Sequence, residues 1–138
     1  MEQKAPAQII GAFEQVGFPG FGMSDLVAKV DTGAYSGALH CTQLREEKGP
    51  KGKVLRFSPF DNPELTVTAD EYSTKYVRSS NGERTKRYFV KTVINIRGRS
   101  YPITLSLANR SDMKWPVLIG RKFLRQNHFL VDAGKFKP

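Results

Sequence analysis

The 138-residue chain contains one cysteine, Cys41, and two histidines, His40 and His128. A single cysteine excludes a framework of internal disulfides, so a reducing cytoplasm is the expected compartment. A zinc site needs three or four Cys, His, Asp or Glu ligands in close geometry, and adjacent residues on a strand point to opposite faces. The sequence also lacks an H-E-x-x-H helix and a G-x-x-x-x-G-K-[ST] phosphate loop. We therefore expect no metal and no cofactor.

Long hydrophobic runs are missing as well. No apolar segment approaches the roughly 20 residues that span a membrane, so we expect no membrane partner. Segment 1–17 has no basic start followed by a long apolar core, and we expect no signal peptide. Hydrophobic residues make up 39% of the chain and charged residues 25%, which is typical of a folded protein. The length predicts one domain, residues 1–138, with a core at about 8–133.

Acidic residues are scarce relative to basic ones: 13 against 22, for a formal net charge of +9. Such an excess attracts nucleic acid, ribosomes or acidic peptides, or it simply forms a solvated surface. No helix or low-complexity tail concentrates the charge, and charge alone identifies no partner. One open interpretation is a monomeric, non-catalytic β-barrel module that binds RNA, a ribosomal protein or a partner enzyme.

The segments that are present are mostly short and apolar or alternating, with Gly and Pro between them, which predicts β-strands. The composition of 48–53 predicts a loop, and 121–127 is the one predicted helix. Many short strands with one helix favour a small β-barrel or sandwich. The predicted strands outside the central region cover 8–16, 25–33, 53–60, 64–69, 115–120 and 128–133.

The clearest supersecondary signal lies at 74–107. Asn81-Gly82 suits the positive φ angles of a tight hairpin. Beyond it, in a strand over 88–97, alternate residues predict one apolar face and one polar face. Gly98 marks a second turn before a strand at 101–107. The apolar face carries Val90, Thr92, Ile94 and Ile96, and the other face carries Lys91, Asn95 and Arg97.

Asp31-Thr32-Gly33 follows an apolar strand. An aspartic protease needs a carboxylate on a rigid loop with a glycine behind it, because backbone must approach the reacting atoms there. The tripeptide alone is weak, since aspartate beside glycine usually closes a turn. No second Asp-Thr-Gly or Asp-Ser-Gly exists in the chain, and Asp132-Ala133-Gly134 lacks the hydroxyl.

Together with "PVLIGRKFL" at 116–124, the Asp31 motif resembles the active-site loop and supporting strand of retropepsin-type aspartic proteases. The blocks "AKVDTGAYSGALH", "VRSSNGE", "ANRSDMKWPVLIGRKFL" and "FLVD" are similar to a bacterial and archaeal family often labelled "ATP-dependent zinc protease" and now regarded as retropepsin-like. The resemblance covers 8–133. It implies a mainly β fold, a small closed barrel of the retropepsin type with one short C-terminal helix.

The resemblance also implies site roles. Asp31 would be the catalytic carboxylate, supported by Thr32, Gly33 and Ala34. Ser79, Ser80, Asn81, Gly82 and Glu83 would form the tip of a flap over the substrate. Val117, Leu118, Ile119, Gly120 and Arg121 would lie beneath the site, with Arg121 bracing the loop. The chain departs from the family at Tyr35, Ser36 and Gly37.

One Asp supplies half of a catalytic dyad, so a peptidase of this type is expected to be a homodimer. The strand at 128–133 is then either a dimer interface or an ordinary edge strand of the monomer. The implied activity is an aspartic endopeptidase without a metal, acting on a peptide or protein. Because family relatives are associated with ligases that add glutamate, a glutamate-rich substrate is expected. A nucleic acid partner is not favoured.

Overall fold

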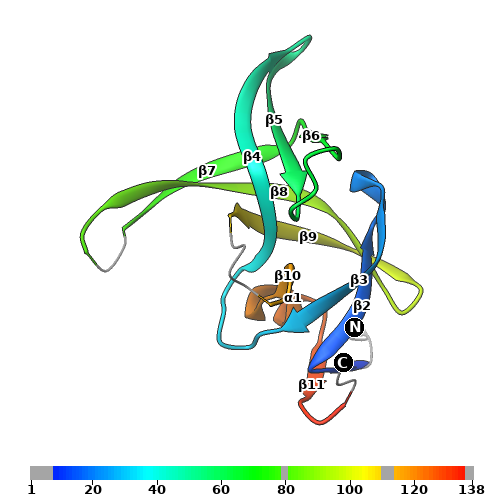
Figure 1. The fold of residues 1–138 in the computed structure, drawn as a ribbon. Helices are drawn as coiled ribbons and strands as arrows, with labels where there is room; N and C mark the ends of the chain where they lie inside the picture. Colours follow the sequence, from blue (N-terminus) through cyan, green and yellow to red (C-terminus); the bar gives the residue numbers. More distant parts are fainter. Residues whose placement is uncertain (1–7, 79–80, 110–113, 136–138) are drawn as a thin grey trace, which may run out of the picture.

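The computed structural model describes residues 8–78, 81–109 and 114–135. Most of them lie in strands (Figure 1). No helix in these residues is long and apolar enough to cross a membrane. In chain order the elements are β1 (Gln8–Gly11), β2 (Phe13–Phe18), the 3-10 helix η1 (Pro19–Phe21), β3 (Met23–Val30), β4 (Gly37–Gly49), β5 (Gly52–Pro59), β6 (Val67–Ala69), β7 (Tyr72–Arg78), β8 (Arg84–Ile96), β9 (Arg99–Ala108), β10 (Val117–Ile119), α1 (Arg121–Gln126) and β11 (Phe129–Asp132).

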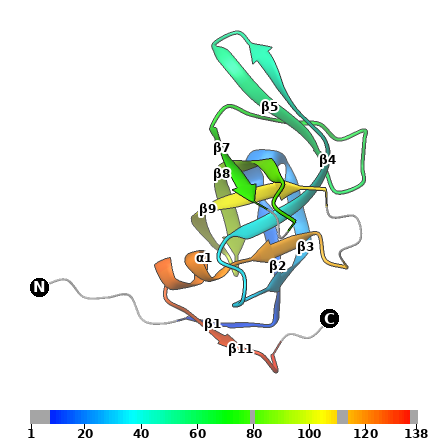
Figure 2. The ribbon, with the colours of Figure 1, turned by 90° about the vertical axis from the view of Figure 1, so that its left-hand side faces the viewer.

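The main sheet closes into a barrel. Its strands follow the order β10, β3, β2, β8, β9 and β4, and β4 pairs again with β10. The short strand β10 is therefore enclosed on both sides: Val117 lies opposite Ala28 in a parallel pairing and opposite Leu39 in an antiparallel one. Helix α1 follows β10 beside the barrel (Figure 2). The prediction of a mainly β, closed retropepsin-type barrel with one short C-terminal helix is confirmed.

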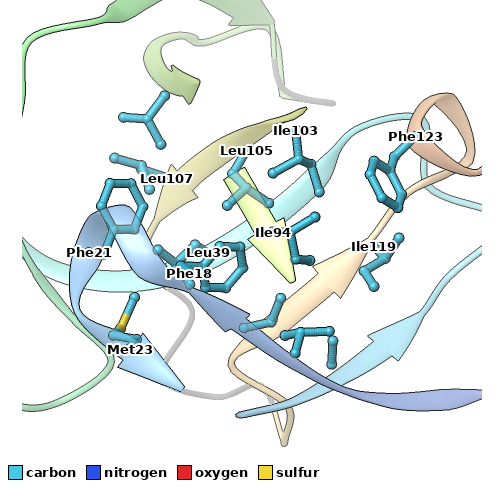
Figure 3. Close-up of a cluster of buried hydrophobic side chains, with 14 of the residues drawn as sticks. Phe18, Phe21, Met23, Leu39, Ile94, Ile103, Leu105, Leu107, Ile119 and Phe123 are labelled. Carbon is cyan, nitrogen blue, oxygen red and sulfur yellow. The ribbon is translucent and has the colours of Figure 1, made fainter. Parts of the chain in front are cut away.

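The barrel interior is filled by side chains from every wall. Along β8, Val90, Ile94 and Ile96 are buried whereas Lys91 and Asn95 are exposed, which confirms the predicted alternation. Phe18, Leu39, Leu105 and Ile119 meet these residues in the core (Figure 3). Burial of this apolar surface is the main source of the barrel's stability.

Two hairpins project from the barrel (Figure 1). One is β7–β8, and the other is the arm formed by β4 and β5, whose last pair is Gly49 with Gly52. The predicted loop at 48–53 is wrong, because both strands run into this segment and leave a turn of two residues. A Cβ on Gly49 would lie 2.9 Å from Cγ1 of Val54, so a larger residue there would require the Val54 side chain to shift.

Other boundaries also differ from the sequence prediction. The predicted strand 8–16 is two strands, since the chain leaves β1 at Gly11 to join the barrel as β2 at Phe13. The predicted strand 64–69 is only three residues long. The long strand β4 was not predicted at all.

A small second sheet lies below the barrel in Figure 2, where β1 pairs in parallel with β11. Ile9 and Leu130 are register partners in this sheet, and they are 48% and 56% exposed. The strand predicted at 128–133 therefore pairs with an element of its own chain and leaves an apolar pair at the surface.

Candidate active site

The Asp31 loop begins where β3 leaves the barrel. The backbone N–H of Asp31 donates to the Ile119 carbonyl at 2.9 Å, which fixes the start of the loop on β10. The Asp31 carboxylate accepts a hydrogen bond from the Gly33 N–H at 3.0 Å. Asp31 is partly exposed, and Thr32 and Gly33 are exposed. The loop is thus held by its backbone while its carboxylate faces accessible space.

The segment after β10 lies directly against the same loop. The Arg121 N–H donates to the Ala34 carbonyl at 2.7 Å, and the Lys122 N–H donates to the Tyr35 carbonyl at 3.0 Å. A Cβ on Gly120 would lie 2.5 Å from the Ser36 carbonyl carbon, so only glycine allows this approach. The structure therefore brings together residues 31–34 and 117–121, two segments far apart in the sequence.

Arg121 reaches the loop with its side chain as well. Its guanidinium donates to the Thr32 carbonyl at 3.0 Å and lies over the Tyr35 ring, 5.7 Å from the centroid. The planar guanidinium suits this combination of hydrogen bonding and stacking. This contact gives Tyr35 a place in the support of the loop.

The predicted flap corresponds to the β7–β8 hairpin, which extends from the same side of the barrel as the loop after β3 (Figure 1). The last described pair is Arg78 with Arg84, so the connection is longer than a two-residue turn. Gly82 has φ +86°, and the Asn81 side chain accepts from the Glu83 N–H at 3.2 Å. Ser79 and Ser80 lie outside the described residues.

The base of this hairpin is attached to the β4–β5 arm through Glu46. The Glu46 carboxylate accepts from the Tyr72 hydroxyl at 2.8 Å, the Tyr88 hydroxyl at 3.0 Å and the Lys86 ammonium at 2.8 Å. These three hydrogen bonds lower the pKa of Glu46 to about 2, and the bond from Lys86 has the largest effect. Sequence reasoning missed this cluster, because its members are spread over three strands.

His40 and Cys41 are adjacent buried residues of β4. His40 is buried and its Nε2 lies 2.9 Å from an Asp61 carboxylate oxygen. Cys41 is buried, and burial raises the pKa of its thiol to about 11. In the part of the chain that the structure describes, no three Cys, His, Asp or Glu side chains group as metal ligands.

Two hollows mark the surface. The larger, about 1060 Å³, lies over β2 and β3 and includes Glu14 and Arg97. The smaller, about 570 Å³, is bounded by Tyr35, Ser36 and Gly37, by the base of the β7–β8 hairpin and by α1. The smaller groove is the one that continues from the Asp31 loop.

A closed barrel whose Asp-Thr-Gly loop rests on an apolar strand ending in Gly-Arg, with a long hairpin on the same side, defines the retropepsin-like class. Residues 9–137 match the model of the RimB-like family, described as retropepsin-like aspartic endopeptidase RimB. The chain belongs to this family, and the resemblance seen in the sequence blocks is confirmed.

Similar proteins extend this picture. A probable alpha-L-glutamate ligase from Shewanella pealeana is 32% identical over 132 residues, which are 92% of this chain and 29% of that protein. One from Desulfotalea psychrophila is 25% identical over 137 residues, again 29% of its length. The chain thus spans less than a third of these relatives. The crystal structure of a Legionella pneumophila protein of unknown function has a TM-score of 0.74 and 26% identity, covering 92% of this chain and 94% of that one.

Proposed function

We propose that the chain is an aspartic endopeptidase in which Asp31 is the catalytic carboxylate. The observation that carries the proposal is the hydrogen bond from the Asp31 N–H to the Ile119 carbonyl, together with the bond from Arg121 to Ala34. They hold the loop on the barrel wall while the carboxylate stays accessible. A preorganised acid on a rigid support is what general acid–base catalysis requires.

The second carboxylate of the dyad comes from another copy of the chain. Within residues 8–78, 81–109 and 114–135, the Asp31 carboxylate accepts a hydrogen bond from its own loop, at the Gly33 N–H. A two-fold axis beside the loop places Asp31 of the partner subunit next to it, and each copy then supplies the same residue.

In this dimer a water molecule is the nucleophile. The ionised Asp31 takes a proton from the water as the water oxygen attacks the scissile carbonyl carbon. The protonated Asp31 of the partner subunit gives its proton to the carbonyl oxygen. The C–N bond of the tetrahedral intermediate then breaks as the nitrogen takes the proton that Asp31 removed from the water. A hydroxyl of the intermediate returns a proton to Asp31 of the partner subunit, which leaves a carboxylic acid and an amine.

We further propose that the substrate is a glutamate-rich peptide or protein segment. The net charge of +9 favours an acidic substrate. The relatives named as probable alpha-L-glutamate ligases contain a region similar to this chain, and their name points to glutamate as the unit added. A peptidase related to that region is suited to the bonds that such a ligase forms.

Replacing Asp31 by Asn tests the peptidase. The change keeps the shape of the side chain and removes the acid, so cleavage of a peptide library should fall by about 10²–10⁴-fold. Asp132→Asn is the matched control, because the Asp132 carboxylate accepts from the Gly134 N–H at 3.0 Å, in the same local geometry as Asp31 with Gly33. Equal cleavage by wild type and Asp31→Asn would contradict the proposal.

The alternative is the monomeric basic module that binds RNA, a ribosomal protein or a partner enzyme. Light scattering separates the two, since a shared dyad requires a dimer. A monomer at high concentration that binds RNA with a steep loss of affinity in salt would favour the module.

A further inference from the structure

The groove of about 570 Å³ beside the Asp31 loop is rich in lysine. Lys75 from β7, Lys91 from β8 and Lys122 from α1 line it, and no acidic residue does. All three lysines are exposed. Three elements therefore direct ammonium groups to one concave surface.

No ion pair between described residues neutralises these ammonium groups. Among the described residues, the ion pairs involve other cations: Lys86 pairs with Glu46, Arg56 and Arg45 with Glu47, and Arg97 with Glu14. Three unpaired like charges around one groove repel one another, and an anion placed between them relieves that repulsion. The groove thus carries a net positive charge that favours an anionic ligand.

The floor of the groove is apolar. Phe89, which shares a face of β8 with Lys91, is partly buried, and the lining also includes Pro102 and the buried residues Ile103 and Phe123. A ligand with a short aliphatic stem and an anionic end fits such a surface, because the stem packs on the floor while the end meets the ammonium groups. A phosphodiester backbone has no apolar stem, so the floor favours an acidic amino-acid side chain.

The position of the groove joins it to the proposed reaction. Its wall begins at Tyr35, in the loop that carries Asp31, and its opposite side is the base of the β7–β8 hairpin at Ser73 and Lys75. An extended peptide that reaches Asp31 under this hairpin would pass the groove. On such a peptide alternate side chains point to the same side, roughly 7 Å apart, so several acidic residues can face the lysines.

We propose that this groove is a substrate subsite in which Lys75, Lys91 and Lys122 bind glutamate or aspartate side chains at a distance from the scissile bond. The assignment rests on the proposed peptidase function, because it makes the groove part of the substrate path. It adds the residues that select the acidic substrate.

Binding tests the groove without cleavage. In an Asp31→Asn background, fluorescence anisotropy measures the affinity of a labelled peptide of eight glutamates and of its neutral eight-glutamine analogue. The glutamate peptide should bind at least tenfold more tightly. Lys75→Gln, Lys91→Gln and Lys122→Gln together should remove about tenfold of that affinity, the order expected for three partly exposed charge pairs, and leave the glutamine peptide unchanged.

A second triple variant separates a specific groove from general attraction. Lys48, Lys51 and Lys53 are exposed at the end of the β4–β5 arm and lie outside the groove. Their change to Gln lowers the net charge by the same amount and should alter the glutamate affinity by less than twofold. Equal losses of glutamate affinity in the two triple variants, or no loss in the groove variant, would overturn the assignment. It would also be overturned if an oligonucleotide of eight phosphates bound more tightly than the glutamate peptide in a groove-dependent way.

Cleavage kinetics then distinguish this inference from the function on which it rests. With Asp31 intact, the groove variant should lower kcat/KM for glutamate-flanked peptides by about tenfold and spare glutamine-flanked ones. Asp31-dependent cleavage with an unchanged preference refutes the groove alone. Groove-dependent peptide binding with no cleavage by wild type refutes the peptidase instead.

Discussion

Gly120 and Gly37 show how little space separates the two segments that build the site. A Cβ on Gly37 would lie 2.8 Å from the Leu118 carbonyl oxygen, and one on Gly120 would meet the backbone of Ser36 and Tyr35. Both obstacles are backbone atoms, which cannot rotate away as a side chain does. The closeness of the Asp31 loop to β10 thus depends on the absence of two side chains.

Gly120→Ala should therefore destabilise the protein and disturb the Asp31 loop. We expect a loss of about 1–3 kcal/mol in the free energy of unfolding, as for other overpacked sites, measured by denaturant titration. Gly134→Ala is the control, because its Cβ would lie 3.6 Å from the Asp132 carboxylate, an ordinary contact. A Gly120→Ala protein as stable as this control would show that the loop has room to shift.

At the scale of elements, the β7–β8 hairpin is linked to the β4–β5 arm through one carboxylate. Glu46 of β4 holds Tyr72 of β7 and both Lys86 and Tyr88 of β8. The arm and the hairpin are thus linked at the hairpin's base, and the two strands continue past this contact to the pair of Arg78 with Arg84.

Glu46→Gln should loosen this link without unfolding the barrel. Hydrogen exchange of the β7 amides should become faster, and exchange of the buried β9 and β10 amides should not change. Glu47→Gln is the control, because Glu47 pairs with Arg45 and Arg56 within the β4–β5 arm.

The same variant has a defined pH dependence. The folded-state pKa of Glu46, about 2, is below its ordinary value of 4.5, so its contribution is present above pH 4.5 and is lost as pH falls toward 2. The difference in Tm between wild type and Glu46→Gln should be constant above about pH 5 and vanish near pH 2. A difference that vanishes already at pH 4 would contradict the role given to Lys86.

The strands that could be predicted from the sequence differ in burial pattern from the strand that could not. The β8 alternation was predictable, because one face of that strand meets the core and the other meets solvent. In β4, Gly37–Cys41 is buried on both faces and the rest forms an arm, so no single period appears. The site divides in the same way: Asp31 and residues 117–121 lie in two contiguous motifs, whereas the groove lysines come from separate elements that only folding brings together.

For the whole molecule, the proposed dyad would make activity a property of two chains. If Asp31→Asn protein is mixed with wild type and the subunits exchange, a mixed dimer has one acid and is inactive. Activity per total protein should then fall as the square of the wild-type fraction, to about one quarter at equal amounts. A linear fall to one half would mean that each chain works alone, and light scattering on the same samples reports the dimer.

Because β10 lies between β3 and β4, the Asp31 loop gains its support only when a segment made much later has folded. The carbonyl that receives the Asp31 N–H belongs to Ile119, and the guanidinium that reaches the Thr32 carbonyl belongs to Arg121. Pairings between such distant segments also form slowly, since they require closure of a long loop. A nascent chain therefore carries Asp31, Thr32 and Gly33 without this support until residues 117–121 have been made. On the proposed function, proteolytic activity begins only after that point.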